Sequence, residues 1–87
     1  MKYYKFITDT PYAGTENTFY LAFENDVSES FLEECAEEFR TQNAQDYEYL
    51  ATGWCEDWES DEEMEQYYES CSCYYLEISE DDYNENT

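Results

Sequence analysis

Residues 28–41 read SESFLEECAEEFRT, and they separate apolar from acidic side chains on a helix. At about 100° per residue, the apolar side chains fall in one stripe and the glutamates cover the opposite face. The stripe contains Phe31, Leu32, Cys35, Ala36 and Phe39, and the acidic face contains Glu29, Glu33, Glu34, Glu37 and Glu38. Asp26 with Glu29, or Ser30 with Glu33, fits a capping box, so we predict a helix from about Ser28 to Thr41 that turns acid outward.

The sequence before this helix predicts a β-hairpin. Residues 2–8 and 18–24 are rich in aromatic and β-branched residues and alternate as half-buried strands do. Pro11 and Gly14 mark a turn between them. Residues 72–78 alternate in the same way and predict a third strand. We therefore expect the α+β class: a small antiparallel sheet, made of the N-terminal hairpin plus a C-terminal strand, with two or three short helices on one side.

The rest of the chain contributes further helices and one ambiguous stretch. Ser60 with Glu63 is a capping box, and the apolar face that follows predicts a second helix from about Asp61 to Ser70. Ser79 is expected to cap a last short helical turn. In residues 43–58, Tyr47 and Tyr49 alternate like a strand, whereas Asp46 to Leu50 fit the end of a helix equally well, and Gly53 interrupts either. We therefore interpret this stretch as a short strand or an irregular connection. The length of 87 residues fits a single domain, residues 1–87.

The charge balance is strongly acidic. The chain has 24 Asp and Glu, three Lys and Arg and no His, which gives a formal net charge of −21. Residues 26–87 hold nearly all of this charge, because Arg40 is their only cation. Such a chain does not neutralise phosphates, so we expect no direct binding to nucleic acid or to an anionic membrane, and basic partners instead. Eleven Tyr, five Phe and two Trp supply the buried area that allows so acidic a chain to fold.

The residue types argue against catalysis and against a cofactor. Without His, neither a Ser-His nor a Cys-His arrangement is possible, so the protein is not expected to be an enzyme. The Cys71-x-Cys73 spacing differs from the C-x₂-C turns of zinc knuckles, and Cys35 lies on the apolar stripe of the helix. Both observations favour structural thiols over zinc, although a zinc-stabilised interaction module is an alternative. The alternating acids of residues 57–63 lack the glycine that a calcium loop needs. No apolar run of about 20 residues and no secretory leader is visible, so we expect a cytoplasmic protein.

A second acidic stretch lies between residues 56 and 65. It holds seven acids in ten positions: Glu56, Asp57, Glu59, Asp61, Glu62, Glu63 and Glu65. These acids with Trp58, and the five glutamates of the helix at 29–38, are the predicted partner-binding residues. Trp54, Trp58, Tyr67 and Tyr68 are candidate aromatic anchors, although a core position is the better prediction for Tyr67. A solvated, soluble face is the simple alternative. Because a duplex carries one negative charge per about 1.7 Å of its axis, rows of carboxylates on helices favour nucleic-acid mimicry.

In kind, the chain resembles small acidic proteins of phages and mobile elements that counter bacterial defence, namely anti-CRISPR proteins and DNA mimics that inhibit restriction enzymes. The resemblance rests on the length, the glutamate rows of residues 29–38, and the acidic segment 56–65 with Trp58 and the pair Tyr67-Tyr68. It implies a basic nucleic-acid-binding protein as partner, with inhibition of an RNA-guided nuclease in the bacterial cytoplasm by occupation of its target-DNA channel. The alternative is an acidic immunity protein or antitoxin that neutralises a basic toxin.

Overall fold

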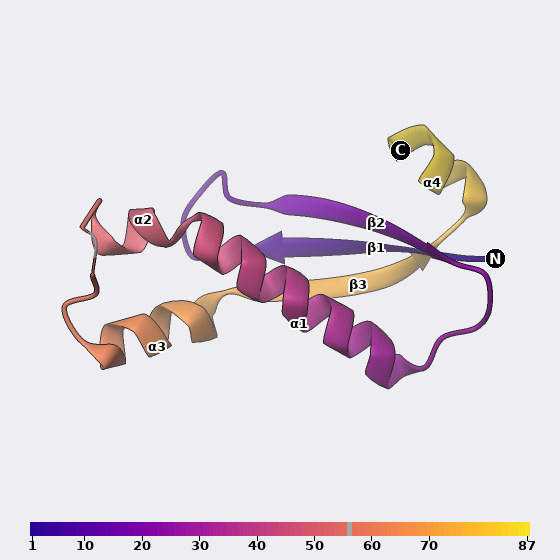
Figure 1. Cartoon of the computed structure of the whole chain (residues 1–87). Coiled ribbons are helices and arrows are strands. Elements are labelled where there is room, and N and C mark those ends of the chain that lie inside the picture. The colour runs from indigo at the N-terminus through magenta and orange to yellow at the C-terminus, as the bar shows by residue number, and fades with distance from the viewer. Residues whose placement is uncertain (56) are drawn as a thin grey trace.

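The computed structural model describes residues 1–55 and 57–87, and its centre is a three-stranded antiparallel sheet (Figure 1). The strands are β1 (Lys2–Asp9), β2 (Asn17–Phe23) and β3 (Ser72–Ile78). β1 lies in the middle, in the order β2-β1-β3, and pairs antiparallel with both neighbours. The predicted hairpin, the predicted third strand and the α+β class are confirmed.

Helix α1 (Glu29–Asp46) begins where the sequence predicts but extends further. Its cap is the Ser28 hydroxyl, which accepts a hydrogen bond from the Phe31 amide at 3.1 Å, and neither predicted capping box is used. Its last turns are held by tertiary contacts. Asn43 is buried, and its side-chain amide donates to the Thr15 carbonyl at 3.2 Å. The turn of the hairpin therefore stabilises a helical extension that the apolar stripe alone did not indicate.

The main core lies between α1 and one face of the sheet. Tyr4 and Phe6 from β1 and Leu32 and Ala36 from α1 are its buried residues. Phe39 completes it, with its ring 5.1 Å from that of Phe6. Because burying an aromatic or aliphatic side chain contributes about 1.5–3 kcal/mol, this contact holds α1 in a fixed orientation on the sheet. Its acidic face is thereby directed to solvent.

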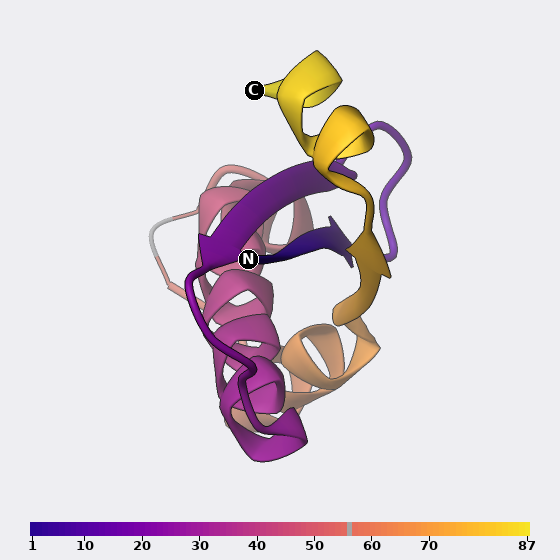
Figure 2. The ribbon, with the colours of Figure 1, turned by 90° about the vertical axis from the view of Figure 1, so that its right-hand side faces the viewer.

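Helix α4 (Glu80–Asn86) packs on the opposite face of the sheet. Figure 2, which looks along the strands, shows α1 and α4 on different sides. The Tyr83 ring lies 4.8 Å from the ring of Tyr3 and 6.5 Å from that of Tyr20. Its cap is the Ser79 hydroxyl, as predicted. The packing of Tyr83 thus places α4 on the face of the sheet opposite α1, whereas the sequence predicts helices on one side only.

Two further helices form a second, smaller core beyond the end of the sheet. They are α2 (Glu48–Thr52) and α3 (Asp61–Ser70), the latter within its predicted bounds. Ala44, Tyr67 and Cys71 are the buried residues of this core, and the Tyr67 hydroxyl donates to the Ala44 carbonyl at 2.6 Å. The strand considered for residues 43–58 is wrong for the described part of that stretch. Instead, α1 continues through residue 46 and α2 follows.

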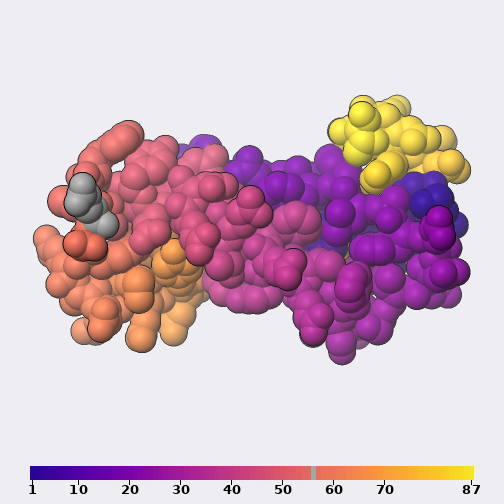
Figure 3. Space-filling model, in the orientation of Figure 1, coloured from indigo at the N-terminus to yellow at the C-terminus, as the bar shows by residue number. Residues whose placement is uncertain are grey.

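The molecule is elongated. Its extents are 46 × 26 × 16 Å, and its radius of gyration of 15.1 Å exceeds the roughly 12 Å of a compact domain of this length. Figure 3 shows the long axis running from the α2 and α3 end to the end that carries α4. Among the described helices, none is long and apolar enough to cross a membrane.

Candidate acidic interface

The helix cluster, Glu29, Glu33, Glu34, Glu37 and Glu38, lies on the first part of α1, and all five residues are exposed. With a rise of about 1.5 Å per residue, Glu29, Glu33 and Glu37 follow one another about 6 Å apart along the axis. The buried Leu32 and Ala36 on the opposite side of the helix fix this orientation. The predicted acidic face of α1 is thus a preformed row of carboxylates.

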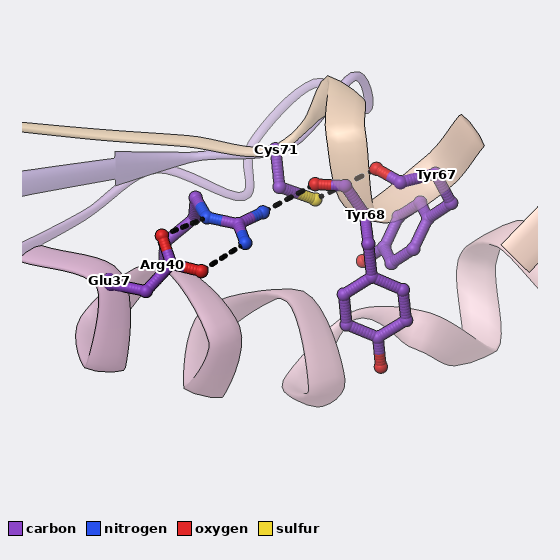
Figure 4. A network of polar contacts seen from close by, with 5 residues as sticks. All are labelled: Glu37, Arg40, Tyr67, Tyr68 and Cys71. Atoms are coloured by element: carbon purple, nitrogen blue, oxygen red, sulfur yellow. Dashed lines mark hydrogen bonds and ion pairs between the residues drawn. The ribbon is translucent and has the colours of Figure 1, made fainter. Parts of the chain in front are cut away.

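One carboxylate of this row is paired. The Arg40 guanidinium binds Glu37 through two nitrogens, at 2.5 and 3.0 Å. These hydrogen bonds lower the pKa of the Glu37 carboxyl. A third nitrogen of Arg40 donates to the Tyr68 carbonyl in the last turn of α3 (Figure 4), where a cation complements the helix dipole. Arg40 therefore links α1 to α3, and Glu37 presents less free charge to a partner than its neighbours do.

The second cluster surrounds the start of α3. Its described acids, all exposed, are Asp57, Glu59, Asp61, Glu62, Glu63 and Glu65. Glu56 lies outside the described residues. The Ser60 hydroxyl accepts a hydrogen bond from the Glu63 amide at 3.2 Å, which confirms the predicted cap. Because negative charge is favoured at a helix N-terminus, the acids of the first turn are partly stabilised by the helix that carries them.

Trp58 belongs to the second core as well as to the predicted interface. It is half-buried, with its ring 5.4 Å from that of Tyr67. Its indole N–H donates to the carboxylate of Glu48 on α2, and the Tyr68 hydroxyl donates to the same carboxylate at 3.3 Å. Trp58 therefore contacts both α2, through Glu48, and α3, through Tyr67. It also forms one wall of a cleft of about 190 Å³ that Asp57, Glu59 and Glu63 line.

Two features of the surface were absent from the predicted interface. One is a third acidic group on α4, formed by Glu80, Asp81, Asp82 and Glu85, all exposed. The other is Trp54, which was only a candidate anchor and is 79% exposed. The charge of α4 is plain in the sequence, whereas the exposure of Trp54 depends on the path of the chain after α2. Tyr67, by contrast, is buried as predicted.

The four cysteines are free thiols in different surroundings. Cys71 belongs to the second core, where its thiol donates to the Tyr67 carbonyl at 3.3 Å. Cys73 packs against the main core, and burial raises the pKa of its thiol to about 11. Within residues 1–55 and 57–87, no group of three or more Cys, Asp or Glu side chains is placed to hold a metal ion. Cys71 and Cys73, although only two residues apart, thus pack in two separate cores.

The acids are distributed along the whole molecule. The helix cluster and the second cluster lie toward opposite ends of the long axis (Figure 1). A net charge of −21 over 46 Å is one charge per about 2.2 Å, close to the value of about 1.7 Å for duplex DNA. Comparisons with protein families, curated proteins and solved structures found no match to this chain. Charge and geometry are therefore the features of this chain that bear on its function.

Proposed function

We propose that this protein is an acidic DNA mimic that inhibits a bacterial defence enzyme by binding the basic groove that the enzyme uses for nucleic acid. The observation that carries the proposal is the linear charge density, one net charge per about 2.2 Å along a rod 46 Å long. A groove that binds a duplex gains most of its affinity from phosphates, without regard to sequence. Carboxylates at a similar density satisfy the same lysines and arginines.

Rigid placement supports the proposal further. The helix cluster is fixed by the core beneath α1, and the acids of the second cluster that lie on α3 are fixed by the cap of this helix and the Arg40 link. Ordering a flexible acidic tail on binding would cost part of the interaction energy, whereas these acids are ordered beforehand. Like charges four residues apart, such as Glu29 and Glu33, destabilise a helix, so their presence favours a binding role.

The favoured target is an RNA-guided DNA nuclease in the bacterial cytoplasm, which would make this an anti-CRISPR protein. Such an enzyme holds nucleic acid in a positively charged channel and reads a short duplex motif with arginines. Both parts attract a rod of carboxylates. The protein is proposed to occupy the target-DNA channel, so the mimic and target DNA exclude each other.

The test is a panel of purified enzymes, comprising guide-loaded DNA nucleases of several types and a restriction endonuclease. Each enzyme is mixed with labelled target duplex and increasing amounts of the protein, and bound DNA is measured by gel shift. We expect displacement of DNA from at least one enzyme at near-stoichiometric protein. A panel in which every enzyme retains its DNA contradicts the proposal. Rescue of cells from a nuclease toxin, without effect on the panel, would support the immunity-protein alternative.

A further inference from the structure

Trp54 occupies a position that neither packing nor backbone preference explains. It follows Gly53 at the end of α2 and is the most exposed of the large apolar side chains described. Its ring contacts that of Tyr49, 4.6 Å away and tilted by 47°, and Tyr49 is itself exposed. The two rings form an uncovered aromatic surface at one end of the molecule. A tryptophan so placed contributes little to the core.

The backbone of Trp54 is also unfavourable. Its φ of +70° lies in the left-handed region, and Trp54 is the only described residue other than glycine with a positive φ. Its amide donates to the Tyr49 carbonyl at 2.9 Å, which continues the tight turn begun by Gly53 at φ +65°. A bulky side chain is an outlier in this conformation, whereas glycine adopts it readily. Glycine would therefore suit this site better than tryptophan if folding alone mattered.

The charge around Trp54 indicates what would cover the ring. Asp57 follows three residues later, so its Cα lies no more than about 11 Å away, and the rest of the second cluster continues from there. A cation is attracted both by these carboxylates and by the face of an indole ring. Arginine suits both contacts best, because its planar guanidinium stacks on aromatic rings and bonds carboxylates in pairs.

We propose that Trp54 is the docking site for an arginine guanidinium of the partner, of the kind that reads a DNA base. The face of the indole offers the guanidinium a surface on which to stack, and the neighbouring carboxylates take the place of phosphates. This inference rests on the proposed function and names the partner group that meets this end of the molecule. Arginines are the commonest side chains to contact bases in the major groove, so a DNA mimic gains specificity by engaging one.

The test uses the two indole N–H signals of the protein in a ¹H–¹⁵N NMR spectrum, since the chain has two tryptophans. Tri-arginine and tri-lysine are titrated separately at low salt, and Trp54→Phe assigns the signals. We expect the Trp54 signal to shift on addition of either peptide. The dissociation constant obtained from this shift should be about two- to fivefold lower for tri-arginine than for tri-lysine. The Trp58 signal should shift less, because the Trp58 indole N–H already donates a hydrogen bond to Glu48. A Trp54 signal that responds equally to both peptides, or to neither, overturns the inference.

Variants separate stacking from simple burial. Trp54→Leu keeps an apolar side chain in the same backbone conformation but lacks the ring, so it should weaken inhibition in any enzyme that the panel identifies, whereas Trp54→Phe should retain most of it. Tyr74→Leu is the matched control, because Tyr74 is 58% exposed on β3 and lies outside both acidic clusters. Trp54→Gly should fold with an unchanged or higher melting temperature. Full inhibition by Trp54→Leu refutes the inference and leaves the DNA-mimic proposal standing. A panel without displacement refutes the DNA-mimic proposal, and with it the inference that rests on it.

Discussion

At the scale of single residues, Arg40 connects the two cores of the molecule. It binds Glu37 on its own helix and the Tyr68 carbonyl at the end of α3. We predict that Arg40→Ala lowers the free energy of unfolding by about 2 kcal/mol, because a charged hydrogen bond to a partly buried carbonyl is lost. Urea denaturation at pH 7 measures this. Glu37→Gln is the control and should cost less than about 1 kcal/mol, since it removes only an exposed ion pair. Equal losses in the two variants would contradict the role of Arg40 as the link.

Cys73 gives the protein a pH dependence on the alkaline side. Burial raises the pKa of its thiol from the ordinary 9.0 to about 11. The unfolded chain therefore loses this proton near pH 9 while the folded chain keeps it, so the contribution to stability is complete below pH 9 and is lost between pH 9 and about 11. We predict that the urea midpoint falls less steeply over this range in Cys73→Ala than in the unchanged protein. Parallel pH profiles for the two proteins would refute the assignment to Cys73.

At the scale of elements, much of the fold is predictable from the sequence and the exceptions have tertiary causes. Caps and alternation correctly predict α3, α4 and the strands, because these signals are local. The extension of α1 depends on Asn43 and its bond to the hairpin turn, which no local pattern contains. The candidate site likewise has features that the sequence predicts and features that it does not. Exposure of the acids follows from helical periodicity, whereas the packing of Trp58 against Glu48 depends on how α2 and α3 meet. The left-handed backbone at Trp54 is not indicated by residue type, because a bulky side chain disfavours it.

The two acidic clusters should respond differently to charge reversal. One variant changes Glu29, Glu33 and Glu34 to Lys and leaves Glu37, the partner of Arg40, in place. The other variant changes Asp57, Asp61 and Glu62 to Lys. We predict a higher melting temperature for the first variant, because the repulsive pairs Glu33–Glu37 and Glu34–Glu38 on neighbouring turns of α1 become attractive. The second should gain no stability, because acids near the N-terminus of α3 are favourable there. Thermal scans at low salt measure both. Equal shifts would contradict the distinction.

The same two variants locate the interface. In the gel-shift assay, the variant whose cluster contacts the enzyme should need at least tenfold more protein to displace DNA, since three attractive charges become repulsive. Circular dichroism confirms that each variant is folded. If neither variant loses inhibition, the electrostatic basis of binding is wrong.

At the scale of the whole molecule, folding works against self-repulsion. A net charge of −21 on 87 residues destabilises the compact state, and the three cations offset little of it. We predict that the melting temperature rises as sodium chloride increases from 10 to about 500 mM, because the Debye length falls from about 30 Å at 10 mM to well under 10 Å. The charge-reversed variant of α1 should show a smaller rise. A melting temperature independent of salt would show that aromatic packing alone sets the stability.

The elongated shape and the charge density together support the central proposal, that this protein competes with DNA for a basic groove. The most direct measurement is the affinity for an inhibited enzyme as a function of salt, with and without saturating target duplex. We predict that the logarithm of the binding constant falls steeply and linearly with the logarithm of salt concentration, and that saturating duplex abolishes binding. Binding that survives saturating duplex, or that hardly changes with salt, would contradict the claim.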